Sequence, residues 1–259
     1  MLAIQTNDKY AIRREHAFLI LAGFFLCSMT MLNIIGITRF VEMGPLALAV
    51  GVLPYPLTFL CTDIISEIYG KRRANFMVTV GLIMNVFIIS VMALANALPS
   101  VPADMMPPWQ VLEIEGQIMT PSGKVLEGPV ELFQLLYACT SGAVVASMAA
   151  YIAAQYCDVQ LFHFWKNLTK GRHLWLRNTF STVISQGVDS VMVVSITFGA
   201  AYLAGDVGIM TLLALMGSNY LFKFCVAIAD TIPFYLAVGF LQKYLNLSPE
   251  QTSRPDHEL

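Results

Sequence analysis

Six stretches of the sequence are apolar over the roughly 20 residues that a helix needs to cross the hydrocarbon core of a membrane. Only 12% of the residues are charged, which is half of what soluble domains usually carry. We therefore expect an all-α membrane protein, a single bundle of six transmembrane helices over residues 1–247. The expected spans are about 17–37, 45–69, 74–98, 132–157, 179–203 and 208–241.

The lysines and arginines outside these spans are distributed unevenly. One set of connections, together with both chain ends, holds twelve of them, whereas the other set holds only Arg39 and Lys124. Because positively charged loops stay on the cytoplasmic side, we expect both termini in the cytoplasm and a multi-pass protein of the inner (plasma) membrane. The twelve are Lys9, Arg13, Arg14, Lys71, Arg72, Arg73, Lys166, Lys170, Arg172, Arg177, Lys243 and Arg254. We expect Arg172 and Arg177 to lie at the lipid headgroups.

Proline and polar residues mark the irregular parts of the chain. Pro54, Pro56 and Pro233 predict kinks in the second and sixth spans. The outer connection, about 99–131, is rich in proline and acid, and its Pro-Ser-Gly turn fits either a small hairpin or an irregular loop. The tail, 248–259, is polar, and we expect it to be disordered.

Ionisable side chains recur inside the expected spans. Asp63 and Glu67 are four residues apart, which places both on one face of a helix. A charge at membrane depth is costly, so it faces the protein interior or a wet cavity. A salt-bridge network that only holds helices together is the alternative, but we favour a polar site for a solute. The residues assigned to this site are Asp63, Glu67, Asn85, Gln186, Asp189, Asn219, Lys223 and Asp230, with Tyr55 and Phe59 as aromatic neighbours.

These residue types suit a planar ligand that donates several hydrogen bonds. A carboxylate can accept two N–H groups from a guanine-like edge, while an amide bonds the ring carbonyl and nitrogen. Tyr55 and Phe59 could stack on a flat ring. The formal net charge of -2 argues against a nucleic-acid partner. The five cysteines form no CxxC pair, so we expect buried thiols, without a metal site or a cofactor.

Motifs in five segments resemble the vitamin uptake transporter family, which is better described as the queuosine precursor transporter family. The segments are 59–72 with its TD-x-x-x-E-x-YGK pattern, 171–178, 181–190 with its S-x-x-x-S-Q-x-x-D pattern, 220–223 and 230–234. The resemblance implies a six-helix bundle similar to the substrate-binding subunits of energy-coupling-factor vitamin transporters. It also implies import of 7-deazaguanines, namely the cyano and aminomethyl precursors or queuine, for queuosine modification of tRNA.

Three functional readings remain open at this point. The first is a secondary importer that works alone, either coupled to protons or by facilitated diffusion. The second is a substrate-binding subunit that needs a separate energising module, although the first span lacks the Ala-x-x-x-Ala pattern expected for docking one. The third, an intramembrane enzyme using Asp63 and Asp189, is disfavoured because the chain has no HExxH, GxSxG or P-loop motif. We expect a transporter, with homodimerisation left open.

Overall fold

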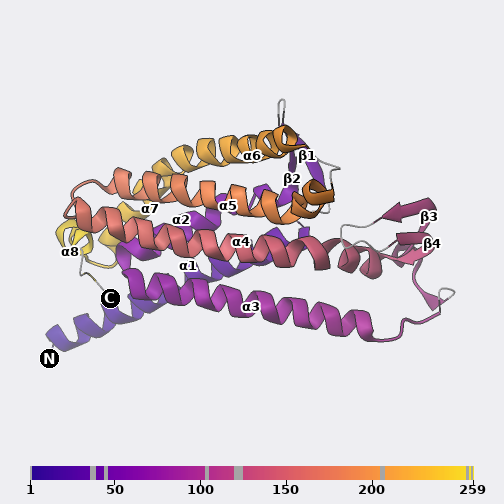
Figure 1. Ribbon diagram of the computed structural model, residues 1–259. Helices are drawn as coiled ribbons and strands as arrows, with labels where there is room; N and C mark the ends of the chain where they lie inside the picture. The colour runs from indigo at the N-terminus through magenta and orange to yellow at the C-terminus, as the bar shows by residue number, and fades with distance from the viewer. Residues whose placement is uncertain are drawn as a thin grey trace.

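The fold is a bundle of long helices with two small β-hairpins. The computed structural model describes residues 2–35, 39–43, 46–102, 105–119, 125–204, 208–254, 257 and 259. Figure 1 shows the long helices side by side, with both termini at one end and strands β3 and β4 at the opposite end. The long helices are α1 (Leu2–Ile35), α3 (Lys71–Ala97), α4 (Leu132–Leu168), α5 (Leu174–Ala204), α6 (Ile209–Ala229) and α7 (Thr231–Tyr244).

Several helices have the length and composition of membrane spans. Among the described residues, four segments are long and apolar enough, and they are Lys9–Leu32, Lys71–Ala97, Leu174–Ile196 and Ile209–Tyr244. The expectation of a helical membrane protein is therefore confirmed. The count of six spans and the cytoplasmic side of the termini stay predictions.

The expectation of a single kinked membrane helix over 45–69 is wrong. Strands β1 (Phe40–Met43) and β2 (Leu46–Ala49) form an antiparallel hairpin. After a short 3₁₀ turn, helix α2 (Tyr55–Ile68) begins. Pro56 lies in the first turn of α2, where the missing N–H of proline removes no helical hydrogen bond. The prolines therefore start a new helix here, where a kink in one long helix was expected.

Helix α2 lies in the centre of the bundle. Its 14 residues are too few to cross a bilayer, because an α-helix rises about 1.5 Å per residue. Every residue from Cys61 to Gly70 is buried, and α2 packs against α1, α3, α4 and α7. Ile65 and Ile68 of α2 belong to one hydrophobic core with Phe162 of α4 and Phe234 of α7. Because α2 is buried on all sides from Cys61 to its end, the polar residues of this part face other helices.

A single glycine makes the corner between α2 and α3. Gly70 has φ 86° and ψ 175°, a conformation that is essentially restricted to glycine. It allows α3 to begin at Lys71, directly after α2 ends, so that the basic run Lys71–Arg73 opens α3.

We expect Gly70→Ala to lower the free energy of unfolding by about 1–3 kcal/mol, the usual cost of a residue held in a sparsely populated conformation. Gly23→Ala is the matched control, because an added methyl group there meets no atom within 4 Å. Thermal unfolding of the detergent-purified variants measures both effects. Equal melting of Gly70→Ala and wild type would contradict the positive φ at this corner.

The later helices differ from expectation at their ends. Helix α4 continues past the expected end at 157 and carries Asp158 and Lys166 into the bundle. The sixth span is broken at Asp230 into α6 and α7, as Pro233 predicts.

The outer connection contains a hairpin, which confirms one of the two alternatives. Strands β3 (Val111–Met119) and β4 (Val125–Glu131) pair antiparallel, with Met119 opposite Val125. The hairpin is longer than its turn motif alone indicates, because the strands extend back to Val111 and forward to Glu131.

The expectation of a disordered C-terminal tail is wrong for its described residues, 248–254, 257 and 259. Ser248 caps helix α8 (Pro249–Ser253) in a capping box with Gln251, and Thr252 is fully buried. A ring nitrogen of His257 hydrogen-bonds the carbonyl of Ile68 at 2.9 Å. These hydrogen bonds satisfy polar groups of the tail, and the one from His257 holds the tail against the end of α2.

Candidate functional site

A small closed cavity lies where α2, α5 and α6 meet, beside the break between α6 and α7. Its volume is about 10 Å³, which is room for one water molecule. A ligand larger than a water molecule therefore does not fit the site in this structure. The lining residues are Tyr55, Pro56, Phe59, Thr182, Gln186, Phe222, Lys223, Val226, Ala227 and Asp230.

Helical spacing brings these side chains together. Tyr55 and Phe59 are four residues apart on α2, as are Thr182 and Gln186 on α5. Residues at this spacing share one helical face, so each helix presents an aromatic or a polar pair to the cavity. Asp230 is both the last cap of α6 and the first cap of α7, which places it at the helix break.

A buried ion pair lies beside the cavity, which one of its members, Lys223, lines. The ammonium group of Lys223 donates a hydrogen bond to Oδ2 of Asp189, and both side chains are at least nine-tenths buried. Lys223 Nζ also lies 4.6 Å from the centre of the Tyr55 ring, in a cation–π arrangement. The pair balances its own charge inside the bundle and fixes Lys223 against an aromatic face.

Among the described residues, three buried polar atoms around this pair make no hydrogen bond of good geometry. They are the Tyr55 hydroxyl, Gln186 Oε1 and Asp189 Oδ1. The Tyr55 hydroxyl lies near the side chains of both Gln186 and Asp189, so these groups can contact one another or a ligand. An unsatisfied buried polar group costs about 1–3 kcal/mol, and native structures keep few of them without a reason. Their concentration at one aromatic-lined cavity marks a place where a polar ligand can bind.

The structure brings together six of the ten residues predicted for the site. Five of them line the cavity, namely Tyr55, Phe59, Gln186, Lys223 and Asp230, while Asp189 is bound to Lys223. Asp63 lies outside the lining, where it accepts a hydrogen bond from Thr182 at 3.1 Å.

Two predicted amides do not line the cavity. Asn85 is buried on α3, and Asn219 is half-buried on α6, one turn before Lys223.

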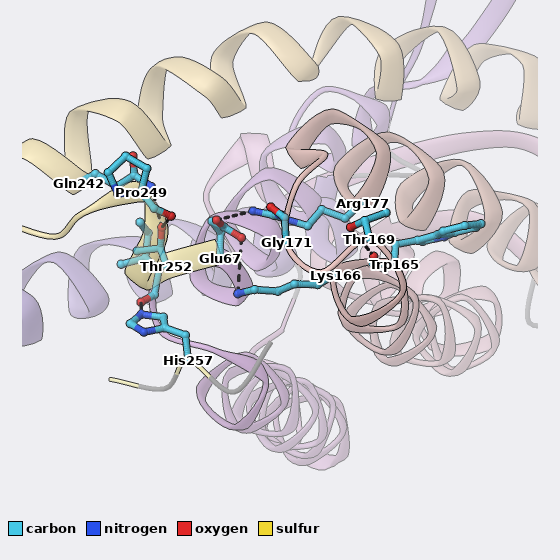
Figure 2. Close-up of polar contacts among 11 residues, drawn as sticks. Glu67, Trp165, Lys166, Thr169, Gly171, Arg177, Gln242, Pro249, Thr252 and His257 are labelled. Carbon is cyan, nitrogen blue, oxygen red and sulfur yellow. Dashed lines mark hydrogen bonds and ion pairs between the residues drawn. The ribbon is translucent and has the colours of Figure 1, made fainter. Parts of the chain in front are cut away.

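Glu67 belongs to a separate salt-bridge network (Figure 2). Its Oε1 accepts a hydrogen bond from Arg177 Nη2 at 2.5 Å, and its Oε2 lies 3.6 Å from Lys166 Nζ. Arg177 also donates to the carbonyl of Gly171 at 2.8 Å. All three charged side chains are at most 1% exposed. The expected placement of Arg177 at the headgroups is therefore wrong, and Lys166 is not a free loop charge, because the buried Glu67 needs positive partners.

Sequence reasoning missed a second buried acid beside Asp63. Asp158 of α4 is fully buried and accepts a hydrogen bond from Ser185 at 3.0 Å. On the same helix, Gln155 donates to the hydroxyl of Tyr151 at 2.7 Å. Tyr151, Gln155 and Asp158 are spaced four and three apart, which is the signal of one helical face. Ending the fourth span at 157 excluded Asp158 from that face.

One of three comparisons with known proteins identifies a transporter family. The family model of the vitamin uptake transporter matches residues 49–237, which include every residue that lines the cavity. Searches of curated proteins and of solved structures find no match. The match covers most of the chain and extends from the turn before α2 into α7. The chain belongs to the vitamin uptake transporter family.

Proposed function

We propose that this protein imports 7-deazaguanines, the precursors of queuosine or queuine itself, across the inner membrane for tRNA modification. The observation that carries the proposal is a group of buried polar atoms on Tyr55, Gln186 and Asp189 without hydrogen bonds of good geometry among the described residues, at or directly beside an aromatic-lined cavity. Membership of a transporter family supports a small organic solute as the cargo. The protein acts as a transporter, not as an enzyme, and needs no separate energising module.

The chemistry of the free atoms matches a guanine-like edge. Such an edge presents N–H donors on the ring and on its exocyclic amine, and Asp189 Oδ1 and Gln186 Oε1 are both acceptors. A carboxylate that accepts such a bond gives a stronger contact than a neutral acceptor does. The Tyr55 hydroxyl can donate to the carbonyl of the ligand, and Phe59 and Phe222 supply ring faces for stacking.

The small cavity requires a conformational change before a bicyclic ligand can enter. The break between α6 and α7 is the natural place for it, since transporters commonly bind solutes at discontinuous helices. Pro233 has no N–H, so the carbonyl of Ala229 lacks its usual helical partner at this break. Movement of α6 would displace Phe222 and Lys223 together and open the cavity.

We expect Gln186→Leu to weaken binding of 7-deazaguanines by about 5- to 150-fold, since it removes one hydrogen bond and leaves a ligand N–H unpaired, at about 1–3 kcal/mol. Gln160→Leu is the matched control, because Gln160 of α4 is exposed. The concentration dependence of uptake of a labelled 7-deazaguanine into proteoliposomes measures the effect. Equal affinities in the two variants would contradict the role of Gln186.

A further inference from the structure

A second pair of acids lies behind the ligand cavity, where α2 meets α4. Asp63 and Asp158 are 2% and 0% exposed. Their carboxyl groups are neighbours, because each accepts a hydrogen bond from one of two residues, Thr182 and Ser185, that lie three apart on α5 and are themselves hydrogen-bonded. No hydroxyl, amide or ammonium group of the described residues donates to Asp63 Oδ1 or to Asp158 Oδ2. The two unpartnered oxygens are therefore available to a cation.

Only uncharged donors and further acids surround this pair. Thr182 donates to Asp63 Oδ2 at 3.1 Å and Ser185 donates to Asp158 Oδ1 at 3.0 Å, both from α5. Ser181 of α5 also faces Asp158. The other titratable groups nearby are the thiol of Cys157 on α4 and the carboxyl group of Asp230 at the α6–α7 break.

The buried cations of the described residues are engaged elsewhere. Lys223 is paired with Asp189, whereas Lys166 and Arg177 are paired with Glu67, one turn along α2 from Asp63. The pair thus has negative charge to neutralise, and no cation in the described part of the chain does so. Because two buried carboxyl groups can hydrogen-bond each other only when one of them carries a proton, the cation that fits best is H⁺.

We propose that the Asp63–Asp158 pair binds one proton and couples its movement to that of the ligand. This inference rests on the proposed function, because coupling needs a transported solute. In the cycle, a proton from the outer solution binds the pair while the ligand cavity is open to that side. The proton leaves to the cytoplasmic solution when the cavity opens inward. The carboxyl O–H bond is the one covalent bond that forms and breaks in this cycle.

Thr182 links the pair to the ligand, because it bonds Asp63 and also lines the cavity. A threonine hydroxyl has one hydrogen to donate. While the pair lacks a proton, that hydrogen is held by the Asp63 carboxylate, and Thr182 can only accept from a ligand. When Asp63 is protonated, its O–H can donate a hydrogen bond to the Thr182 oxygen. The Thr182 hydroxyl can then donate its own hydrogen to a ligand in the cavity. Proton and ligand occupancy are therefore linked through one side chain.

Proteoliposomes that contain the purified full-length protein separate coupling from ligand binding. Exchange of labelled for unlabelled 7-deazaguanine at equal pH on both sides needs only the ligand site. A gradient of one pH unit, acid outside, is expected to give about tenfold accumulation if one proton accompanies each ligand. In Asp158→Asn, the amide N–H can donate to Asp63 and imitate the one-proton state permanently.

We expect Asp158→Asn to keep exchange near the wild-type rate and to lose accumulation driven by the pH gradient. The control Glu113→Gln, at an exposed acid of β3, should keep both. Exchange by wild type without any response to the gradient would overturn the coupling and leave the proposed function intact. Accumulation that follows a sodium gradient in place of the pH gradient would overturn the assignment to a proton.

Failure of every 7-deazaguanine to exchange would contradict the proposed function. A measurement that needs no ligand tests the proton site separately. Infrared spectroscopy of the purified protein detects the carbonyl band of a protonated, buried carboxyl group. We expect this band in wild type and in Glu113→Gln, and its loss in the double variant Asp63→Asn/Asp158→Asn. Absence of the band from wild type, or its persistence in the double variant, would overturn the proposal.

Discussion

Glu67→Gln is expected to lower the free energy of unfolding by about 3–5 kcal/mol, because it leaves buried cations without a counter-charge. Glu67 is the carboxylate partner of both Lys166 and Arg177, and all three side chains are at most 1% exposed. The glutamine keeps the shape of the side chain but carries no charge. Thermal and denaturant unfolding of the detergent-purified protein measures the loss.

Two comparisons show whether buried charge is the cause. Glu15→Gln makes the same chemical change in a surface pair, where Glu15 is 56% exposed beside Arg73, and breaking such a pair costs about 0.2–1 kcal/mol. The triple variant Glu67→Gln/Lys166→Met/Arg177→Met removes all the charges and should recover much of the lost stability. A Glu67→Gln protein as stable as Glu15→Gln would show that the network does not hold the fold together.

The Lys223–Asp189 pair is expected to support both folding and transport. Lys223→Met or Asp189→Asn alone leaves one buried charge unpaired, at a cost of about 3–5 kcal/mol to stability. The double variant has neither charge, so we expect its melting temperature to return toward that of wild type. It should still fail to take up 7-deazaguanines, because the carboxylate that accepts the ligand N–H groups is gone.

Melting temperature and uptake by the same three variants together distinguish a structural pair from a ligand site. Recovery of folding without recovery of uptake agrees with direct ligand contact at Asp189. A double variant that folds and transports like wild type would show that the Lys223–Asp189 pair does not contact the ligand and would remove it from the proposed site.

The sequence predicts the membrane class, a kink in the sixth span from Pro233 and half of the residues that line the cavity, because these follow from hydrophobic length, proline position and helical spacing. Tyr55 and Phe59 meet Gln186 and Lys223 as expected. Helix spacing fixes which residues share a face, and expensive buried polar groups tend to share a site.

For residues near the ends of the expected spans, the sequence did not show whether the side chain is buried in the bundle or lies at the membrane surface. Apolar length does not distinguish a helix that crosses lipid from one enclosed by other helices. The sequence therefore predicted one membrane span over 45–69, which is longer than α2 (Tyr55–Ile68). Basic residues beside a span resemble headgroup anchors, and only the position of Glu67 shows that Lys166 and Arg177 turn inward. Asp158 stayed hidden because no sequence signal marks where α4 continues past the expected end of its span.

The most direct test of the central claim is ligand-induced thermal stabilisation of the purified wild-type protein. The ligands are the 7-deazaguanine series, with guanine and riboflavin as comparisons. A ligand that binds only the folded state at 100 times its Kd stabilises it by about 2.7 kcal/mol. We predict a rise in melting temperature with one or two 7-deazaguanines and none with riboflavin. A rise with riboflavin alone, or no rise with any 7-deazaguanine, would contradict the proposed cargo.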